Sequence, residues 1–203
     1  MIVAYMKPTN YCNVGCTHCY LPEVVRANKF RMSPETLEQA ATLIGEMVRA
    51  QRKEGALILW HGGEPLTVPV DWYYAAGDIL DRVLPKHMQA IQTSLIPWRD
   101  EYTDWVIDRC GREVGSSLDF SQRKIKGSVE NYHKLWMQKV DKVRGHDIRV
   151  VPGVVPTRNE VGREDDLIQW FVDRDFDVVN LDRYNAYQGY FDDRPNNLEH
   201  SYF

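Results

Sequence analysis

Three cysteines stand close together near the start of the chain, in the segment Cys12-Asn13-Val14-Gly15-Cys16-Thr17-His18-Cys19-Tyr20. Their spacing is Cys-x3-Cys-x2-Cys, and the segment follows a short apolar run. Thiolates are soft ligands, so three of them in one loop favour an iron-sulfur cluster or zinc over magnesium or calcium. The spacing therefore predicts a metal centre held by Cys12, Cys16 and Cys19.

The identity of that metal centre depends on the fourth ligand. A structural zinc ion needs another Cys or His at ligand spacing, and a cluster ligated entirely by protein needs a fourth cysteine. The only other cysteine, Cys110, lies far along the chain in a segment with a helical pattern. A disulfide framework is disfavoured, because three loop thiols leave one unpaired and nothing marks the chain as secreted. We expect a cluster with one iron open to a small molecule, with structural zinc as the alternative.

The elements that must position this loop alternate between strand and helix patterns. An apolar, β-rich run over Ile2–Lys7 leads into the cysteines, and Ser33-Pro34-Glu35 begins an amphipathic helix that stops near Gly55. Further strands are expected over Ala56–Trp60, Met88–Thr93, Glu113–Asp119, Ile148–Val155 and Val178–Leu181, and further helices over Trp72–Val83, Trp98–Cys110, Ser128–Arg144 and Asp165–Asp175.

Such alternation predicts right-handed βαβ crossovers and a parallel sheet. A complete eight-unit barrel takes about 250 residues, so six units in 203 residues predict an α/β fold, a partial (β/α)6 TIM-like barrel with parallel strands and outer helices. The runner-up is a doubly wound sheet, whose Gly-x-Gly-x-x-Gly fingerprint is absent. We expect one domain over residues 1–191, and a polar linker or the start of a truncated C-terminal region over residues 192–203.

Two motifs in this order resemble those of the radical S-adenosylmethionine (SAM) superfamily. The family's cysteine loop has the same spacing after its first strand, and Gly62-Gly63-Glu64-Pro65 follows an apolar run as the family's GGEP motif follows its second strand. The resemblance implies a [4Fe-4S] cluster whose open iron is chelated by SAM, and an electron that cleaves SAM to methionine and a 5'-deoxyadenosyl radical. The chain looks most like ribosomal-peptide maturases and sulfatase maturases, without their C-terminal cysteine-rich domain.

Other site candidates lie at the carboxyl ends of the predicted strands, because functional groups collect there in a parallel barrel. Gly62 and Gly63 would let the backbone approach SAM closely, and a cis-like or strained turn at Glu64-Pro65 would aim carbonyls toward its ammonium group. Ser94 stands where the family often has an asparagine that contacts SAM.

Later strand ends add four more candidates. Ser117 and Asp119 resemble the family's Ser-x-Asp pattern, in which the serine approaches the ribose or carboxylate of SAM and the acid shapes the substrate side. Phe120 departs from the glycine that commonly follows. Arg123 is expected either to pair with the methionine carboxylate or to be a solvated loop residue. Val154 is expected either to face adenine or to belong to the barrel core.

Aromatic and polar residues near the cysteines complete the list. His18 occupies the position where the family has an aromatic residue near the adenine, and Tyr20 is expected to shield the cluster. His61 reads as a strand-end hydrogen bonder and Cys110 as structural, and no catalytic residue is identified. Four polar residues at the end of the predicted sixth strand are further candidates for substrate or adenine contacts. They are Asn180, Asp182, Arg183 and Tyr184.

The composition indicates a soluble globular protein. The chain is 43% hydrophobic and 27% charged, and its formal net charge is -4, with basic residues dispersed among acids. Such a charge does not favour nucleic acid. Neither a membrane span nor a signal peptide is evident, which predicts a reducing cytoplasm and no membrane. Expected partners are a peptide or protein substrate and an electron donor such as flavodoxin or ferredoxin. The alternative to an enzyme is a catalytically silent scaffold that binds the cluster and SAM and needs a partner chain.

Overall fold

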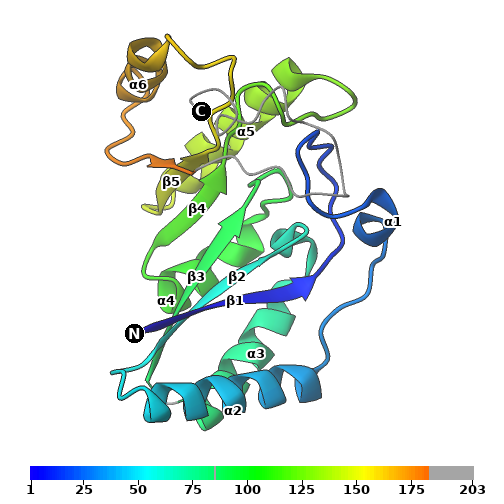
Figure 1. The fold of residues 1–203 in the computed structure, drawn as a ribbon, viewed down its shortest axis with the longest axis vertical. Coiled ribbons are helices and arrows are strands. Elements are labelled where there is room, and N and C mark those ends of the chain that lie inside the picture. The colour runs from blue at the N-terminus through cyan, green and yellow to red at the C-terminus, as the bar shows by residue number, and fades with distance from the viewer. Residues whose placement is uncertain (85, 183–203) are drawn as a thin grey trace, which may run out of the picture.

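Six parallel strands follow one another in sequence order, β1-β2-β3-β4-β5-β6, in the computed structural model of the chain, which describes residues 1–84 and 86–182 (Figure 1). A doubly wound sheet would reverse its strand order at a switch point, so this order identifies the predicted partial (β/α)6 barrel. The strands are β1 (Ile2–Thr9), β2 (Ala56–Gly62), β3 (His87–Thr93), β4 (Glu113–Ser117), β5 (Arg149–Val154) and β6 (Asn180–Leu181).

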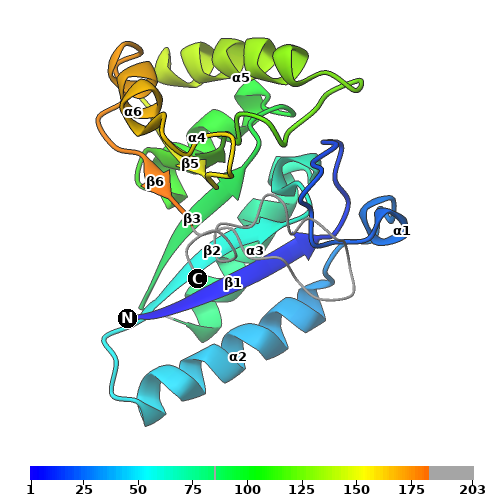
Figure 2. The ribbon, with the colours of Figure 1, turned by 45° about the horizontal axis from the view of Figure 1, so that its top comes forward.

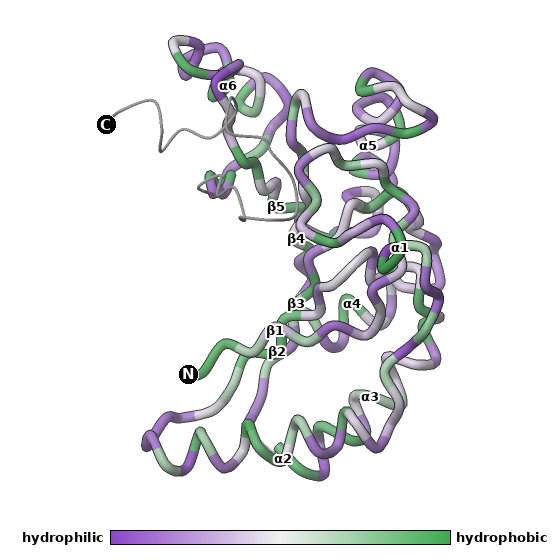
Figure 3. Tube along the Cα trace, turned by 45° about the vertical axis from the view of Figure 1, so that its right-hand side comes forward, coloured by the Kyte–Doolittle hydropathy of each residue, from purple (hydrophilic) through white to green (hydrophobic). Residues whose placement is uncertain are grey.

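Helices connect successive strands and cover the outside of the sheet. Figure 3 shows the strands following an open arc, with α3, α4 and α5 on its outer side. None of the helices within the described ranges is long and apolar enough to cross a membrane. The helices are α1 (Glu23–Arg26), α2 (Pro34–Ala50), α3 (Val70–Val83), α4 (Thr103–Arg109), α5 (Val129–Arg144) and α6 (Glu164–Val172), with 3-10 turns at Pro65–Thr67 and Asp100–Tyr102.

Capping chemistry explains where two long helices begin. The side chain of Ser33 accepts a hydrogen bond from the backbone N–H of Thr36, and Ser128 accepts one from that of Asn131. Each serine satisfies a backbone donor that the first turn of its helix leaves free. The predicted starts of these helices are confirmed within one residue.

Other element bounds differ from the sequence-based expectation. β1 continues through Pro8 to Thr9, because it is an edge strand and a proline there removes no ladder hydrogen bond that a neighbour needs. α4 begins only at Thr103, after a 3-10 turn, and β4 already ends at Ser117. α1 is too short for sequence periodicity to reveal.

Large aromatic side chains fill the space between the sheet and its helices. Trp60, Trp105 and Trp136 are fully buried. The indole N–H of Trp60 donates to Gln89 Oε1 at 2.9 Å, and that of Trp136 donates to Ser116 Oγ at 2.8 Å. Because the indoles of Trp60 and Trp136 are paired, burying these two rings carries little desolvation cost, whereas the buried indole N–H of Trp105 has no hydrogen-bond partner among the described residues. The core thereby holds the strand ends that build the site.

We predict that Trp136→Ala lowers the free energy of unfolding by about 3–5 kcal/mol, because it leaves a large cavity between α5 and the sheet. Leu43→Ala on α2 is the control, since Leu43 is 60% exposed, and it should change stability by less than about 0.5 kcal/mol. Urea unfolding followed by circular dichroism measures both. Equal effects of the two substitutions would contradict this account of the core.

Candidate functional site

The cysteine loop and the carboxyl ends of the first four strands line one cavity, which is partly open to solvent. All three loop cysteines line it together with most of the predicted cofactor-binding residues. Those lining residues are Cys12, Cys16, Cys19, His18, Tyr20, Gly62, Gly63, Glu64, Ser94, Ser117 and Arg123.

Three predicted residues lie outside this lining. Pro65 opens the 3-10 turn after β2 and is buried. Asp119 is 1% exposed and lies behind the cavity. Val154 is part of the hydrophobic core, which agrees with the second of its two expected roles. At the sixth strand, Asn180 and Asp182 are exposed, whereas Arg183, Tyr184 and the predicted boundary at residue 191 lie outside the described residues.

The cysteine loop has a cavity side and a solvent side. Asn13, Gly15 and Thr17 are exposed, whereas Cys12 and Cys16 are half-buried against the cavity. Backbone hydrogen bonds hold the loop from two directions. The N–H of Cys12 donates to Arg26 at 3.0 Å, that of Gly15 to Lys124 at 3.0 Å, and that of Thr17 to Gln122 at 2.9 Å.

The environment of the thiols suits a cationic cluster. Burial raises the pKa of Cys12 to about 12 and also raises the pKa of Cys16, where the Arg123 guanidinium acts in the opposite direction. Buried thiols become thiolates when a metal supplies positive charge. Among the described residues, no group of three or more His, Cys, Asp or Glu side chains is placed to hold a single metal ion. Three soft thiolate donors that line one cavity fit an iron-sulfur cluster.

The two glycines at the end of β2, Gly62 within the strand and Gly63 directly after it, allow two backbone segments to touch. A Cβ on Gly63 would lie 2.2 Å from the carbonyl oxygen of Asn10 and 2.3 Å from that of Tyr11. The N–H of Gly63 donates to Thr9 at 3.0 Å and that of Glu64 to Tyr11 at 2.7 Å. The close approach therefore joins the GGEP turn to the start of the cysteine loop.

The expected strained turn at Glu64-Pro65 is partly wrong. No cis peptide bond occurs within residues 1–84 and 86–182, and Glu64 has an ordinary extended conformation with φ -124° and ψ 103°. The unusual backbone lies at Gly62, whose φ of 132° only glycine adopts readily. The unusual backbone conformation therefore lies at Gly62, two residues before the Glu64-Pro65 position that the sequence predicted.

Glu64 is a buried brace between two strand ends. Its carboxylate is 1% exposed and accepts three hydrogen bonds. The donors are Thr93 Oγ1 at 2.5 Å, the N–H of Ser94 at 2.8 Å and the N–H of Leu66 at 3.1 Å. The carboxylate therefore fixes the end of β3 relative to the turn after β2, a role that the motif alone does not reveal.

We predict that Glu64→Gln lowers the free energy of unfolding by about 1–3 kcal/mol, because its amide NH2 would face the N–H of Ser94, donor against donor. Glu38→Gln is the matched control, since Glu38 lies on the surface in an exposed ion pair with Arg82, and it should change stability by less than about 1 kcal/mol. Thermal or chemical unfolding compares them. A Glu64→Gln protein as stable as the control would show that the carboxylate is not a brace.

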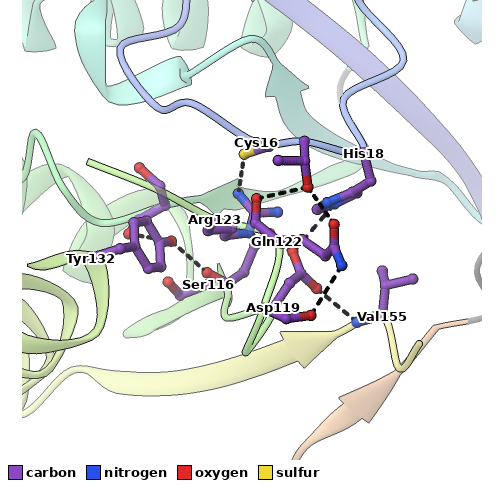
Figure 4. Close-up of polar contacts among 12 residues, drawn as sticks. Cys16, His18, Ser116, Asp119, Gln122, Arg123, Tyr132 and Val155 are labelled. Atoms are coloured by element: carbon purple, nitrogen blue, oxygen red, sulfur yellow. Dashed lines mark hydrogen bonds and ion pairs between the residues drawn. The ribbon is translucent and has the colours of Figure 1, made fainter. Parts of the chain in front are cut away.

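Asp119 contacts both Arg123 and His18 of the cysteine loop (Figure 4). Its Oδ2 accepts from Arg123 Nε at 2.5 Å and lies 3.4 Å from His18 Nε2, while its Oδ1 accepts from the N–H of Val155 at 2.8 Å. Arg123 Nη1 in turn lies 3.5 Å from Cys16 Sγ. Arg123 is thus a half-buried, ion-paired residue at the cluster loop and not the solvated loop arginine of the alternative interpretation.

Several lining residues are absent from the sequence-based set. Gln92 donates to Ser117 Oγ at 3.0 Å, and Gly115 leaves room for it, because a Cβ there would lie 2.0 Å from Gln92 Oε1. His61 also lines the cavity, and burial lowers its pKa with help from nearby Lys7 and Arg123. Strand alternation toward Ser94 could have indicated Gln92. Val14 and Thr93 complete the lining.

Six sequential parallel strands, with the three-cysteine loop after β1 and the GGEP turn after β2, constitute the radical SAM fold. A serine-type anaerobic sulfatase-maturating enzyme of Bacteroides thetaiotaomicron is 28% identical over 162 residues, which cover 70% of this chain and 36% of that enzyme. The chain is thus similar in sequence to part of a sulfatase-maturating enzyme. No family model matches the chain.

Solved structures agree on the fold. Native anSMEcpe with bound AdoMet matches with a TM-score of 0.73 at 16% identity, over 98% of this chain and 56% of that one. Streptococcus suis SuiB bound to S-adenosylmethionine matches with a TM-score of 0.61 at 14% identity, over 93% of this chain and 42% of that one. The chain therefore spans about half or less of the length of the proteins it resembles.

Proposed function

We propose that the chain binds a [4Fe-4S] cluster and SAM in its cavity and cleaves SAM reductively, so that the resulting radical abstracts hydrogen from a peptide or protein side chain. The observation that carries the proposal is that the cysteine loop and the GGEP turn line the same cavity. The relation to a sulfatase-maturating enzyme supports a peptide or protein substrate. A structure of anSMEcpe that holds both AdoMet and the Cp18Cys peptide gives further support.

In this proposal the three loop cysteines ligate three irons, and the bound cluster supplies the electron that cleaves SAM. The protein groups bind and orient SAM and the substrate, and they exclude water from the site. The guanidinium of Arg123 keeps a positive charge beside Cys16, which favours the thiolate form that metal binding needs. Asp119 holds that guanidinium in place and is itself too buried to meet a large substrate.

The cavity also presents hydroxyl and backbone groups suited to the polar parts of SAM. Ser94 and Ser117 line it from the ends of β3 and β4. Gln92 orients the hydroxyl of Ser117 through its hydrogen bond. His18 and Tyr20 cover the loop side, where Lys7 donates to the Tyr20 hydroxyl at 2.7 Å. We assign these side chains to binding and positioning.

The proposed setting is a reducing cytoplasm with a one-electron donor such as flavodoxin or ferredoxin. All four cysteines are free thiols, which such a compartment preserves. A scaffold that binds SAM without turnover is the second candidate. Measured cleavage of SAM would distinguish the scaffold from the enzyme.

We predict that Cys12→Ala, Cys16→Ala and Cys19→Ala each abolish the visible absorbance of the anaerobically reconstituted protein, because three thiolates are needed to hold the cluster. Cys110→Ala is the control and should retain about four irons per chain, since Cys110 is buried at the C-terminal end of α4, away from the cysteine loop. Iron and sulfide analysis with absorbance spectra measures this. Full absorbance in all three loop variants, or about eight irons per chain, would contradict the assignment.

We predict that the reduced protein converts SAM to 5'-deoxyadenosine after dithionite is added, because the cluster and SAM share one cavity. Mass spectrometry detects the product, and the Cys16→Ala protein serves as the inactive control. Tight binding of SAM with no cleavage, even when peptides or partner chains are supplied, would favour the scaffold over the enzyme.

A further inference from the structure

Two basic segments flank the cysteine loop. Residues 24–31 and 120–128 together contain six Lys or Arg residues and no Asp or Glu, although the whole chain has a net charge of -4. The first segment begins at the second residue of α1, directly after the acidic Glu23, and the second segment precedes α5. Positive charge is therefore concentrated at one place in an otherwise acidic chain.

Both segments are attached directly to the cysteine loop. The loop donates a backbone hydrogen bond to Arg26 on one side and another to Lys124 on the other side. Figure 2 shows the loop that follows β1 lying between α1 and the segment that leads into α5, and Figure 1 shows the same neighbours from a second direction. The basic segments thus form the rim of the loop.

The exposed side of the loop lies within this rim. Asn13, Gly15 and Thr17 are exposed, whereas the cysteines that alternate with them line the cavity. A single layer of backbone therefore separates solvent from the proposed cluster. An electron that enters from this side crosses less protein than one that must pass through the aromatic core.

The charges on the rim are available to a partner. Among residues 1–84 and 86–182, no carboxylate forms a salt bridge with the rim cations, whereas Arg82, Arg109 and Arg149 elsewhere all pair with acids. Two exposed apolar side chains lie in the same segment as Arg26, Lys29 and Arg31 of the rim. Val24 is 78% exposed and Phe30 is 75% exposed. Exposed apolar side chains beside complementary charges are a common composition of protein interfaces. The rim cations are Arg26, Lys29, Arg31, Lys124 and Lys126.

We propose that this surface, which we call the basic face and define as Val24, Lys29, Phe30, Arg31, Lys124 and Lys126, docks a small acidic one-electron carrier protein. The inference rests on the proposed function, in which each cleavage of SAM consumes one electron. The chain has only one cysteine outside the loop, so it offers no second cluster through which the electron could enter. The carrier is oxidised by one electron and the loop's cluster is reduced by one. Charge complementarity selects an acidic carrier.

Paired charge reversals test the proposal. Lys29→Glu/Lys126→Glu alters the basic face, and Lys53→Glu/Lys134→Glu alters two exposed lysines elsewhere, with the same change in net charge. The measurement is the rate at which photoreduced flavodoxin reduces the reconstituted cluster, followed by stopped-flow absorbance at low and high salt. The basic-face variant should react about tenfold or more slowly at low salt and lose most of its salt dependence. The control variant should stay within about threefold of the wild type.

Reduction by dithionite separates this proposal from the proposed function. Both variants and the wild type should be reduced equally by dithionite, because that small reductant needs no docking surface. Equal flavodoxin rates in the two variants, with normal clusters, would overturn the docking surface alone. Loss of RNA binding in the basic-face variant without a change in flavodoxin rate would assign the surface to nucleic acid and overturn it as well. A wild-type chain that assembles no cluster would overturn both proposals.

Discussion

The close backbone approach at Gly63 is the constraint on which the rest of the site depends. The cysteine loop and the GGEP turn come from different βα units, and their backbones meet where no side chain fits, against the carbonyls of Asn10 and Tyr11. Two backbone hydrogen bonds close that contact. The carboxylate of Glu64, the next residue, accepts hydrogen bonds from Thr93 and Ser94 and so links the turn to the end of β3. A short chain of contacts therefore sets the cavity wall across three strands.

A second chain of contacts closes the site from the opposite side. Asp119 joins the N–H of Val155 to Arg123 and His18, and Arg123 reaches Cys16. The desolvation cost of burying this carboxylate is offset by its charged and backbone donors, as a buried ion requires. The loop is thus held between a neutral backbone contact and a charged network. Most of the polar contacts described around Asp119 therefore serve to position the cysteine loop.

Much of this arrangement follows from local sequence signals, and the rest depends on contacts between distant residues. Cysteine spacing and the two glycines identified the loop and the turn, because their chemistry depends on nearest neighbours. Alternating apolar segments indicated six βα units, because each strand and helix carries its own period. The hydrogen bonds of Glu64 and the burial of Asp119 could not be predicted, because each depends on which strand ends become adjacent. The turn at Glu64-Pro65 was misplaced for the same reason, since its geometry is set by the loop it touches.

The order of the strands along the sheet has a consequence for biosynthesis. The loop cysteines lie near the beginning of the chain, but Gln122, Arg123 and Lys124, which hold the loop's far side, are made more than a hundred residues later. At synthesis rates of about 5–20 residues per second, the thiols remain uncovered on the nascent chain for roughly 5–20 seconds. During this interval the thiols proposed to hold the cluster are accessible, because the residues that later bury them have not yet been made.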